Sequence, residues 1–237
     1  MNQAVSPALS PTVLITGAAG NLGRTVAAVF RGRGAQLVLV DRLADDLRRA
    51  FGAADERQLL VAADLLQPAD AAHAVQEALQ RWPRIDVLCN LAGGFRMGEA
   101  VHETSDETWN FLFDINLRTV LHMVRAAVPK MIEGGGGNII NVGAQSARQG
   151  LAGMGAYCAA KQAVVRLSEA MAAELASHRI RVNCVLPSVI DTPQNRAAMP
   201  EADTSRWVSP QEIAEAIAYL VSPAASGISG AAVPLGR

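Results

Sequence analysis

The chain has 237 residues, of which 50% are hydrophobic and 18% charged, and its formal net charge is -1. This length corresponds to one large domain or two small ones, with enough residues for a buried core. A net charge near zero, without a cluster of Lys and Arg, excludes the electrostatic footprint of a nucleic-acid-binding protein. No apolar run approaches the roughly 18 residues of a membrane span. The composition therefore favours neither a nucleic-acid nor a membrane partner.

Residues 1–11 have no basic start, and Pro7 and Pro11 interrupt any apolar stretch, which argues against a secretory signal. We expect a short flexible terminus over residues 1–11. The three cysteines are odd in number and widely spaced, a pattern that fits neither a disulfide framework nor a metal site. We therefore expect a cytoplasmic protein without a metal ion, whose cysteines are small buried side chains.

Short apolar runs alternate with longer alanine-rich amphipathic stretches along the chain. The expected strands are Thr12–Thr16, Gln36–Val40, Gln58–Ala62, Ile85–Asn90, Asn138–Val142, Arg181–Leu186 and Ala231–Pro234. The expected helices are Leu22–Gly34, Leu43–Phe51, Pro68–Trp82, Ser105–Ile132, Tyr157–His178 and Pro210–Val221. This alternation predicts a single α/β domain over residues 1–237, a Rossmann-like doubly wound parallel sheet of about seven strands with helices on both faces.

Local signals mark several boundaries of these elements. Asp70 stands just ahead of an alanine-rich run, and Ser209 precedes Pro210, a cap followed by proline at the first helical position. The glycines of Gly134–Gly137 are expected to end the long helix, because glycine accepts positive φ at little cost. Asp191–Val208 is the longest irregular segment, and is either a substrate-covering loop or a plain surface excursion.

A glycine-rich turn follows the first strand directly. Thr16–Gly23 reads Thr-Gly-Ala-Ala-Gly-Asn-Leu-Gly and then opens a helix. Small residues allow the backbone to approach a pyrophosphate, while the helix N-terminus offers free N–H groups and positive dipole to that anion. The turn therefore predicts a dinucleotide site that includes Gly17, Gly20, Asn21, Leu22 and Gly23.

Carboxylates end the second and third expected strands. Asp41 stands 18 residues beyond Gly23, the last glycine of the turn. This is close to the offset of roughly 20 residues at which a carboxylate accepts hydrogen bonds from the adenine-side ribose. A carboxylate there repels a 2′-phosphate, so NAD(H) is preferred, while the neighbouring Arg42 leaves NADP(H) possible. Asp41 could instead cap the next helix, or do both. Asp64, with Leu65 beside it, is similarly placed to touch the adenine.

Tyr157 and Lys161 are four residues apart on an expected helix, so their side chains share one face. The chain has only two tyrosines and two lysines, so chance produces such a pair about one time in sixty. A free phenol titrates near pH 10, and a nearby ammonium lowers that pKa and makes the phenol a usable acid–base group. The alternative is a tyrosine beside a solvated lysine.

Six motifs occur in this order and spacing along the chain. They are Thr16–Gly23, Asp64-Leu65, Asn90-Leu91-Ala92-Gly93, Asn116 within residues 114–117, Tyr157-x-x-x-Lys161 and the segment from Pro187 to Thr192. Together they resemble the short-chain dehydrogenase/reductase family over nearly all of residues 12–234. The resemblance implies a nicotinamide-dependent oxidoreductase acting on a small-molecule substrate, with Tyr157 as general acid–base. It also implies a homodimer or homotetramer, paired through the helices around residues 108–132 and 157–178.

The resemblance assigns further roles. Lys161 lowers the pKa of Tyr157 and holds the nicotinamide ribose, and Asn116 supports a water relay behind Lys161. Ile190 and Thr192, following Pro187, hold the carboxamide. Asn90, Ala92 and Gly93 line the cofactor cleft.

Four positions depart from the family pattern. Asn21 stands where glycine is usual, and Leu91 and Ser188 replace the usual Asn and Gly. Ala144 stands where the family carries a serine that orients the substrate. Alanine cannot donate a hydrogen bond to a carbonyl. Ser146 would share a face with Ala144 if the strand continued, but lies one pleat repeat too far without a bulge. Whether Ser146 replaces the missing serine stays open.

One branch with alanine at this position is the dihydropteridine reductases. The segments Gly150 to Tyr157 and Leu186 to Trp207 resemble theirs, which implies NADH-dependent reduction of a quinonoid pterin as an alternative function. A non-catalytic NAD(H)-binding redox sensor is an alternative of another class. The residues expected to line the substrate pocket are Phe95, Arg96, Ala144, Ser146, Met154 and Trp207.

Overall fold

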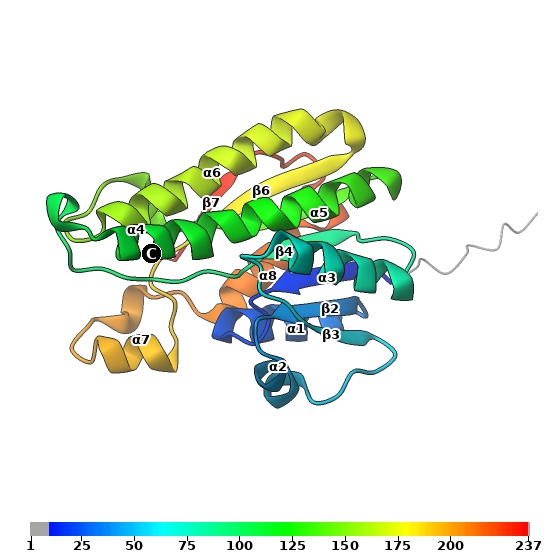
Figure 1. Ribbon diagram of the computed structural model, residues 1–237, viewed down its shortest axis with the longest axis horizontal. Coiled ribbons are helices and arrows are strands. Elements are labelled where there is room, and N and C mark those ends of the chain that lie inside the picture. Colours follow the sequence, from blue (N-terminus) through cyan, green and yellow to red (C-terminus); the bar gives the residue numbers. More distant parts are fainter. Residues whose placement is uncertain (1–9, 237) are drawn as a thin grey trace, which may run out of the picture.

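Seven parallel strands form one sheet in the computed structural model, which describes residues 10–236. Their order across the sheet is β3-β2-β1-β4-β5-β6-β7 (Figure 1). The strands are β1 Thr12–Thr16, β2 Gln36–Asp41, β3 Gln58–Ala62, β4 Val87–Asn90, β5 Gly137–Val142, β6 Ile180–Pro187 and β7 Ala232–Leu235. The predicted doubly wound α/β fold is confirmed, and residues 1–9 of the expected flexible terminus lie outside the described part.

Helices cover both faces of the sheet. They are α1 Asn21–Gly32, α2 Ala44–Phe51, α3 Pro68–Arg81, α4 Asp106–Phe113, α5 Thr119–Glu133, α6 Gly155–Leu175, α7 Pro193–Ala198 and α8 Pro210–Leu220. Buried side chains of α3, α5 and α6 pack on one face, and those of α1, α2 and α8 pack on the other. Because both faces are covered, the inner strands are apolar on both sides, as the sequence pattern predicts.

The expected single helix over Ser105–Ile132 is wrong in one respect. The chain forms α4, then a π turn over Asp114–Arg118, and then α5. Inside this turn, Asn116 donates from Nδ2 to the carbonyl of Leu112 at 2.9 Å and to that of Gly94, also at 2.9 Å. Such turns hold one extra residue per turn and recur at functional sites, and this one directs a buried amide inward.

The other boundaries lie within three residues of the predicted ones, and β1, β3 and the start of α3 at Pro68 match them. Asp70 lies in the first turn of α3, where its carboxylate accepts the N–H of Asp64 at 2.9 Å. The segment expected to be irregular over 191–208 contains α7, whose N-cap Thr192 accepts the N–H of Asn195. Ser209 caps α8 in a reciprocal capping box, as its position before Pro210 predicts.

Candidate active site

Strands β1 and β4 are neighbours at the point where the strand order reverses, and their carboxyl ends open a crevice. Two loops meet there. Thr16 Oγ1 accepts the N–H groups of Leu91 and Ala92 at 3.1 and 3.2 Å. A Cβ added to Gly17 would lie 2.9 Å from the backbone of Ala92. The residues after β1 and those after β4 therefore form one continuous surface at the switch point.

The glycine turn after β1 leaves its backbone accessible only because side chains are absent. Gly17 has a φ of 62°, and a Cβ on Gly23 would lie 2.3 Å from the Gly17 oxygen. No side chain caps α1, so the N–H groups of its first residues, Asn21 and Leu22, face outward without an intrahelical partner. This cradle fits the pyrophosphate of a dinucleotide, because it offers N–H donors and the positive end of a helix dipole.

Asp41, at the end of β2, holds this turn. Its Oδ2 accepts the N–H of Ala19 at 2.9 Å, and its Oδ1 accepts the N–H of Arg42 at 2.8 Å. The alternative of a helix cap is wrong, because α2 begins at Ala44 with Leu43 as its N-cap. A carboxylate accepts about four hydrogen bonds, so Asp41 retains capacity for a ribose hydroxyl. Arg42 is exposed beside it.

The end of β3 is organised by a histidine that the sequence did not single out. Asp64 Oδ1 accepts the N–H of Leu66 at 3.0 Å. His122 of α5 is buried, and its Nδ1 lies 2.8 Å from the carbonyl oxygen of Leu65. The contact joins residues 57 positions apart, so no local spacing could have revealed it. Its effect is to fix the backbone that presents Asp64.

Tyr157 and Lys161 lie one turn apart on the first part of α6. Lys161 is 6% exposed, and its Nζ donates to the carbonyl of Val142, the last residue of β5, at 2.9 Å. Burial lowers the pKa of Lys161 to about 8. Burial also raises the pKa of Tyr157 to about 12, which is opposite to the expected lowering. The main cause is that the fold removes water from the phenol, which disfavours its charged form.

Asn116 and Lys161 converge on Gly93. Asn116 Oδ1 accepts the N–H of Gly94 at 3.1 Å. A Cβ on Gly93 would lie 2.9 Å from Asn116 Oδ1 and 3.3 Å from Lys161 Nζ. The loop after β4, the π turn and α6 therefore meet in one small polar space. The sequence motifs predict that these three segments belong to one site, but their spacing along the chain does not show that they touch.

A buried polar chain lies beneath these groups. Asn90 Nδ2 donates to Asn141 Oδ1 at 2.8 Å, and Asn141 Nδ2 donates to Ser168 Oγ at 2.8 Å. Ser168 in turn donates to the carbonyl of Val164 at 2.7 Å. Asn141 and Ser168 are residues that the sequence reasoning missed. They tie β4 and β5 to α6 and so fix the helix that carries Tyr157 and Lys161.

The expected substrate-side residues come partly together. The rings of Phe95 and Tyr157 meet edge to face, with centroids 4.8 Å apart. Met154 is the N-cap of α6 and lines a small cavity together with Arg96 and Tyr157. Ala144 is buried two residues beyond β5.

Ser146 does not extend the face of β5. The strand ends at Val142, and Ser146 lies in a 3-10 turn over Gln145–Arg148. Ser146 would share a face with Ala144 only if the strand continued, and the strand does not continue. Whether Ser146 orients a substrate stays a prediction.

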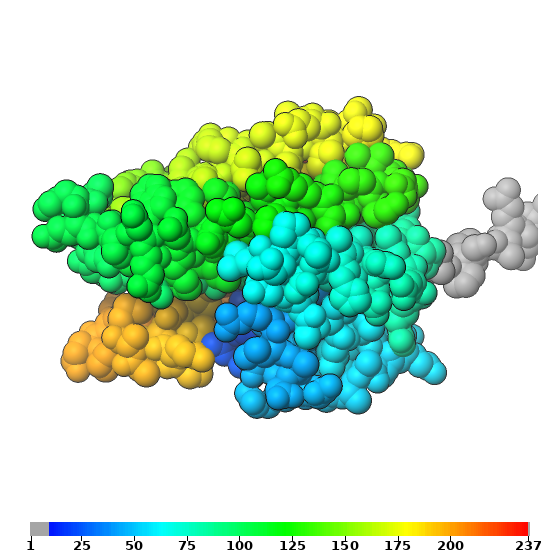
Figure 2. All heavy atoms as spheres, in the orientation of Figure 1, coloured from blue at the N-terminus to red at the C-terminus, as the bar shows by residue number. Residues whose placement is uncertain are grey.

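The α7 lobe, defined as residues 189–207, borders the crevice. Figure 2 shows a hollow between this yellow-orange lobe and the green surface built from the loop after β4 and from α4. Asn195 Nδ2 donates to the carbonyl of Ile190 at 2.8 Å within the lobe. Asn21 Nδ2 donates to Gln194 Oε1 at 2.6 Å and thus joins the glycine turn to the lobe.

Two classes of feature are absent from residues 10–236. No group of three or more His, Cys, Asp or Glu side chains there could hold a metal ion. Across the same residues, no helix combines the length and apolar character that crossing a bilayer requires.

The sequence model of the family described as short chain dehydrogenase matches residues 11–203 of this chain. The chain belongs to this short-chain dehydrogenase family. It is 34% identical to a D-threitol dehydrogenase of Mycolicibacterium smegmatis over 230 residues, covering 92% of this chain and 88% of that one. It is also 31% identical to a (-)-trans-carveol dehydrogenase of Rhodococcus erythropolis, covering 94% of each chain.

Solved structures of short-chain dehydrogenases agree. A 3-ketoacyl-(acyl-carrier-protein) reductase from Brucella melitensis, complexed with NADH, matches with a TM-score of 0.86 and 32% identity, covering 95% of this chain and 96% of that one. A carveol dehydrogenase from Mycobacterium avium, in complex with NAD, matches with a TM-score of 0.85 and 28% identity, covering 97% of each chain. The protein is thus an oxidoreductase that uses a nicotinamide cofactor.

Gly93 gives a direct test of the short-chain dehydrogenase site. In Gly93→Ala, the new methyl group would press on Asn116 Oδ1 and Lys161 Nζ, both buried and hydrogen-bonded. Displacing a positioned group by about 1 Å costs roughly 100-fold in rate, so we expect kcat to fall by about that factor. Steady-state kinetics with the fastest acceptor measures the change.

Gly32→Ala is the matched control for this substitution. Gly32 lies in the last turn of α1, and a Cβ there meets nothing within 4 Å. We expect this variant to keep the wild-type kcat and to gain up to about 1 kcal/mol of stability, because alanine favours helix. A Gly93→Ala enzyme with kcat within twofold of wild type would contradict the convergence of Asn116 and Lys161 on this glycine.

Proposed function

We propose that the enzyme transfers hydride between NAD(H) and a small carbonyl compound or the corresponding secondary alcohol, with Tyr157 giving or taking the proton. The observation that carries the proposal is the convergence of Lys161 and Asn116 on Gly93, with Lys161 Nζ bound to the carbonyl of Val142 and Tyr157 one turn before Lys161 on α6. A protein that only bound the cofactor would have no use for a half-buried phenol and a buried ammonium one turn apart.

Each group of the site has a part in the proposed reaction. When bound, the nicotinamide supplies or accepts hydride. The turn Gly17–Gly23 and the carboxylate of Asp41 would hold its dinucleotide, and Ile190 and Thr192 would hold the carboxamide. Tyr157 Oη moves the proton at the carbonyl oxygen, while the Lys161 ammonium favours the phenolate form. Asn116 keeps the loop after β4 against Lys161 through its bonds to Gly94.

The preference for NAD(H) over NADP(H) is attributed to the charge of Asp41. Asp41→Asn keeps an oxygen that can accept the Ala19 N–H but removes the charge that repels a 2′-phosphate. We expect the ratio of kcat/KM for NADPH to that for NADH to rise about tenfold, the equivalent of about 1.4 kcal/mol.

Asp46→Asn is the control for the cofactor experiment, because Asp46 is a surface carboxylate of α2 paired with Arg49. It removes the same charge without touching the glycine turn, and the ratio should stay at the wild-type value. An Asp41→Asn enzyme with an unchanged ratio would show that another group selects the cofactor.

The test of the function is NADH consumption with a panel of ketones, quinones and quinonoid dihydropterin, alongside NADH binding followed by fluorescence. Turnover of one acceptor, lost in Tyr157→Phe, supports the proposal. Tight NADH binding without turnover of any acceptor would refute it. The buried, donor-free side chain of Ala144 favours quinonoid dihydropterin as a second candidate, because an electron-poor acceptor needs less polarisation.

Two further expectations belong to this proposal. We place the enzyme in the reducing cytoplasm, which is supported by the free and buried state of Cys89, Cys158 and Cys184. We also propose a homodimer or homotetramer, and light scattering of the purified protein would determine which one forms.

A further inference from the structure

Exposed apolar side chains gather around the start of α6. Phe95 is 52% exposed, Met97 61% and Val101 76%, all within the loop after β4, and Leu151 is exposed in the loop before α6. Large apolar side chains exposed together on a folded chain mark a binding surface more often than chance exposure does. We therefore ask which part of the fold these exposed side chains surround.

The two loops that carry these side chains are joined next to Tyr157. The N–H of Gly98 donates to the carbonyl of Gly153 at 2.8 Å. Val101 Cγ2 would lie 2.7 Å from a Cβ on Gly155, two residues before Tyr157. Phe95 touches the ring of Tyr157 edge to face and leaves about half of its own surface open. The apolar surface thus begins at the residue that handles the proton.

The charged groups of the same loop are already engaged. Arg96 lies over the ring of Phe111, 4.1 Å from its centroid, and its Nη1 is 3.1 Å from Glu107 Oε1. Glu99 accepts hydrogen bonds from the N–H of Ser105 at 2.9 Å and from Thr108 Oγ1 at 2.9 Å. The wall beside Tyr157 therefore offers a substrate apolar surface rather than hydroxyl partners.

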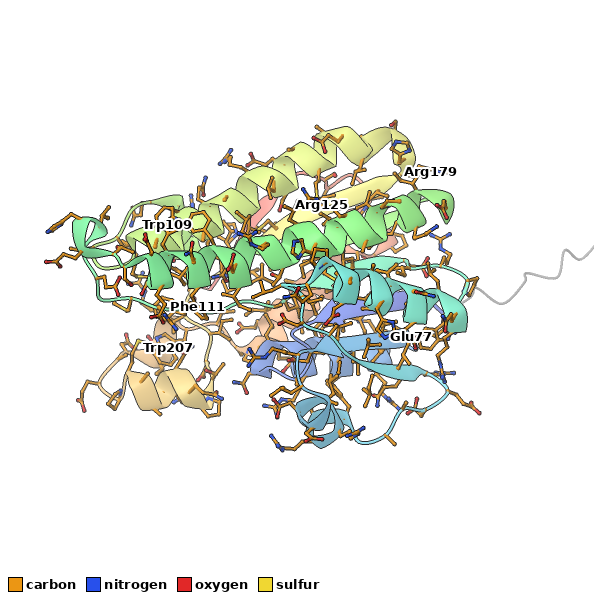
Figure 3. All side chains as sticks on the ribbon, viewed as in Figure 1. Glu77, Trp109, Phe111, Arg125, Arg179 and Trp207 are labelled. Carbon is orange, nitrogen blue, oxygen red and sulfur yellow. The ribbon has the colours of Figure 1, made fainter. Side chains whose placement is uncertain are left out.

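The α7 lobe also exposes apolar side chains. Val189 and Met199 are each 38% exposed, and Figure 3 shows Trp207 on the part of the lobe that lies toward Phe111 of α4. Ala144 contributes a methyl group without a donor. Hydroxyl groups of a substrate enclosed here would lose water without gaining partners, which lowers their binding.

We propose that the substrate is a secondary alcohol or ketone whose reacting carbon belongs to an apolar ring, which packs on the open face of Phe95, and that polyols are excluded. This specificity rests on the proposed function of Tyr157. Two kinds of substrate are named among the relatives, the open-chain polyol of the threitol dehydrogenase and the cyclic alcohol of the carveol dehydrogenase. The proposal favours the cyclic alcohol.

The experiment compares cyclohexanol with D-threitol as substrates for oxidation by NAD⁺. Each additional apolar methylene changes kcat/KM by about 10- to 200-fold in an apolar pocket, so we expect cyclohexanol to exceed D-threitol by at least about 100-fold. Equal values, or a higher value for D-threitol, would overturn the inference while leaving the proposed function intact.

The variant Phe95→Ala tests whether the side chain of Phe95 causes the preference for cyclohexanol. Loss of an aromatic contact corresponds to about a five- to tenfold rise in KM, which we expect for cyclohexanol and not for D-threitol. Trp109→Ala is the control, because Trp109 is a partly exposed aromatic residue of α4 whose ring stacks on Phe113, whereas the ring of Phe95 contacts Tyr157. A Phe95→Ala variant that raises KM for both alcohols equally, or for neither, would overturn the role of Phe95.

Calorimetric binding to Tyr157→Phe loaded with NAD⁺ separates the two proposals. We expect cyclohexanol to bind this variant more tightly than D-threitol whether or not the wild-type enzyme oxidises it. Binding of cyclohexanol to this variant, with neither alcohol nor any acceptor of the panel turned over by wild type, would refute the proposed function and support the apolar pocket. Absence of selective binding would overturn the apolar pocket.

Discussion

Replacing Tyr157 by phenylalanine is expected to lower kcat by about 10²- to 10⁴-fold, the range that a positioned acid–base group contributes. The substitution removes one oxygen atom, and the ring contact with Phe95 at a centroid distance of 4.8 Å should persist. Single-turnover kinetics with NADH and the fastest acceptor measures the loss, and cofactor fluorescence tests whether NADH binding is retained.

The chain contains its own control for this variant. Tyr219 is the other tyrosine, and it is exposed on α8. Tyr219→Phe should leave kcat unchanged. A Tyr157→Phe enzyme that reacts at the wild-type rate would show that another group moves the proton, although the family assignment would stand.

Lys161→Met is expected to lower activity and to raise stability at the same time. Without the ammonium, nothing one turn away favours the phenolate of Tyr157, and we expect kcat to fall on the order of 100-fold, the lower end of what a positioned acid–base group contributes. The buried charge itself is costly, because the pKa of Lys161 falls from 10.5 to about 8. At 1.36 kcal/mol per unit, the cost of the charged form is roughly 3 kcal/mol.

Methionine also leaves the Val142 carbonyl without its donor, which costs about 1 kcal/mol. The net expectation at pH 7 is therefore a gain of about 2 kcal/mol in the free energy of unfolding, measured by urea denaturation. Such opposite effects on stability and activity are typical of groups held in place for chemistry.

The lowered pKa of Lys161 also determines how the free energy of unfolding changes with pH. Between pH 8 and 9 the unfolded chain keeps the Lys161 proton that the native state releases, so this lysine makes the free energy of unfolding rise with pH in wild type. Below pH 8 the lysine is charged in both states and its contribution is constant. Above pH 9 the raised pKa values of the buried Cys89 and Cys184 oppose the trend, because the unfolded thiols ionise first, and above pH 10 the raised pKa of Tyr157 does the same. Lys161→Met should abolish the rise between pH 8 and 9.

Lys130 supplies the control for this comparison. It is the other lysine of the chain, and its Nζ forms a surface ion pair with Glu133. Lys130→Met should change both stability and activity little, because exposed ion pairs contribute about 0 to 1 kcal/mol. A Lys161→Met protein less stable than wild type at pH 7 would contradict the assignment of Lys161 as a costly buried cation.

Much of the architecture could be predicted because it is encoded locally. The alternation of apolar runs and amphipathic stretches fixes the strands and helices, and the glycines of Thr16–Gly23 have a steric meaning wherever a strand turns directly into a helix. The spacing of Tyr157 and Lys161 is likewise a property of one helix. Such features depend on residues a few positions apart.

The remainder depends on contacts that no local spacing encodes. The π turn at Asn116 is fixed partly by Gly94, and the Asp41 carboxylate holds Ala19, 22 residues away. The chain from Asn90 through Asn141 to Ser168 joins three elements. The pKa of Tyr157 was predicted in the wrong direction, because a four-residue spacing describes proximity to Lys161 but not how much water the fold removes from the phenol.

The most direct measurement of the central claim follows deuterium from C4 of reduced nicotinamide during turnover of the fastest acceptor. Mass spectrometry of the product should find one deuterium, on the former carbonyl carbon. In Tyr157→Phe, the rate at which deuterium reaches the product should fall by the same factor as kcat. Product without deuterium on that carbon, or label transfer unaffected in Tyr157→Phe, would contradict hydride transfer assisted by Tyr157.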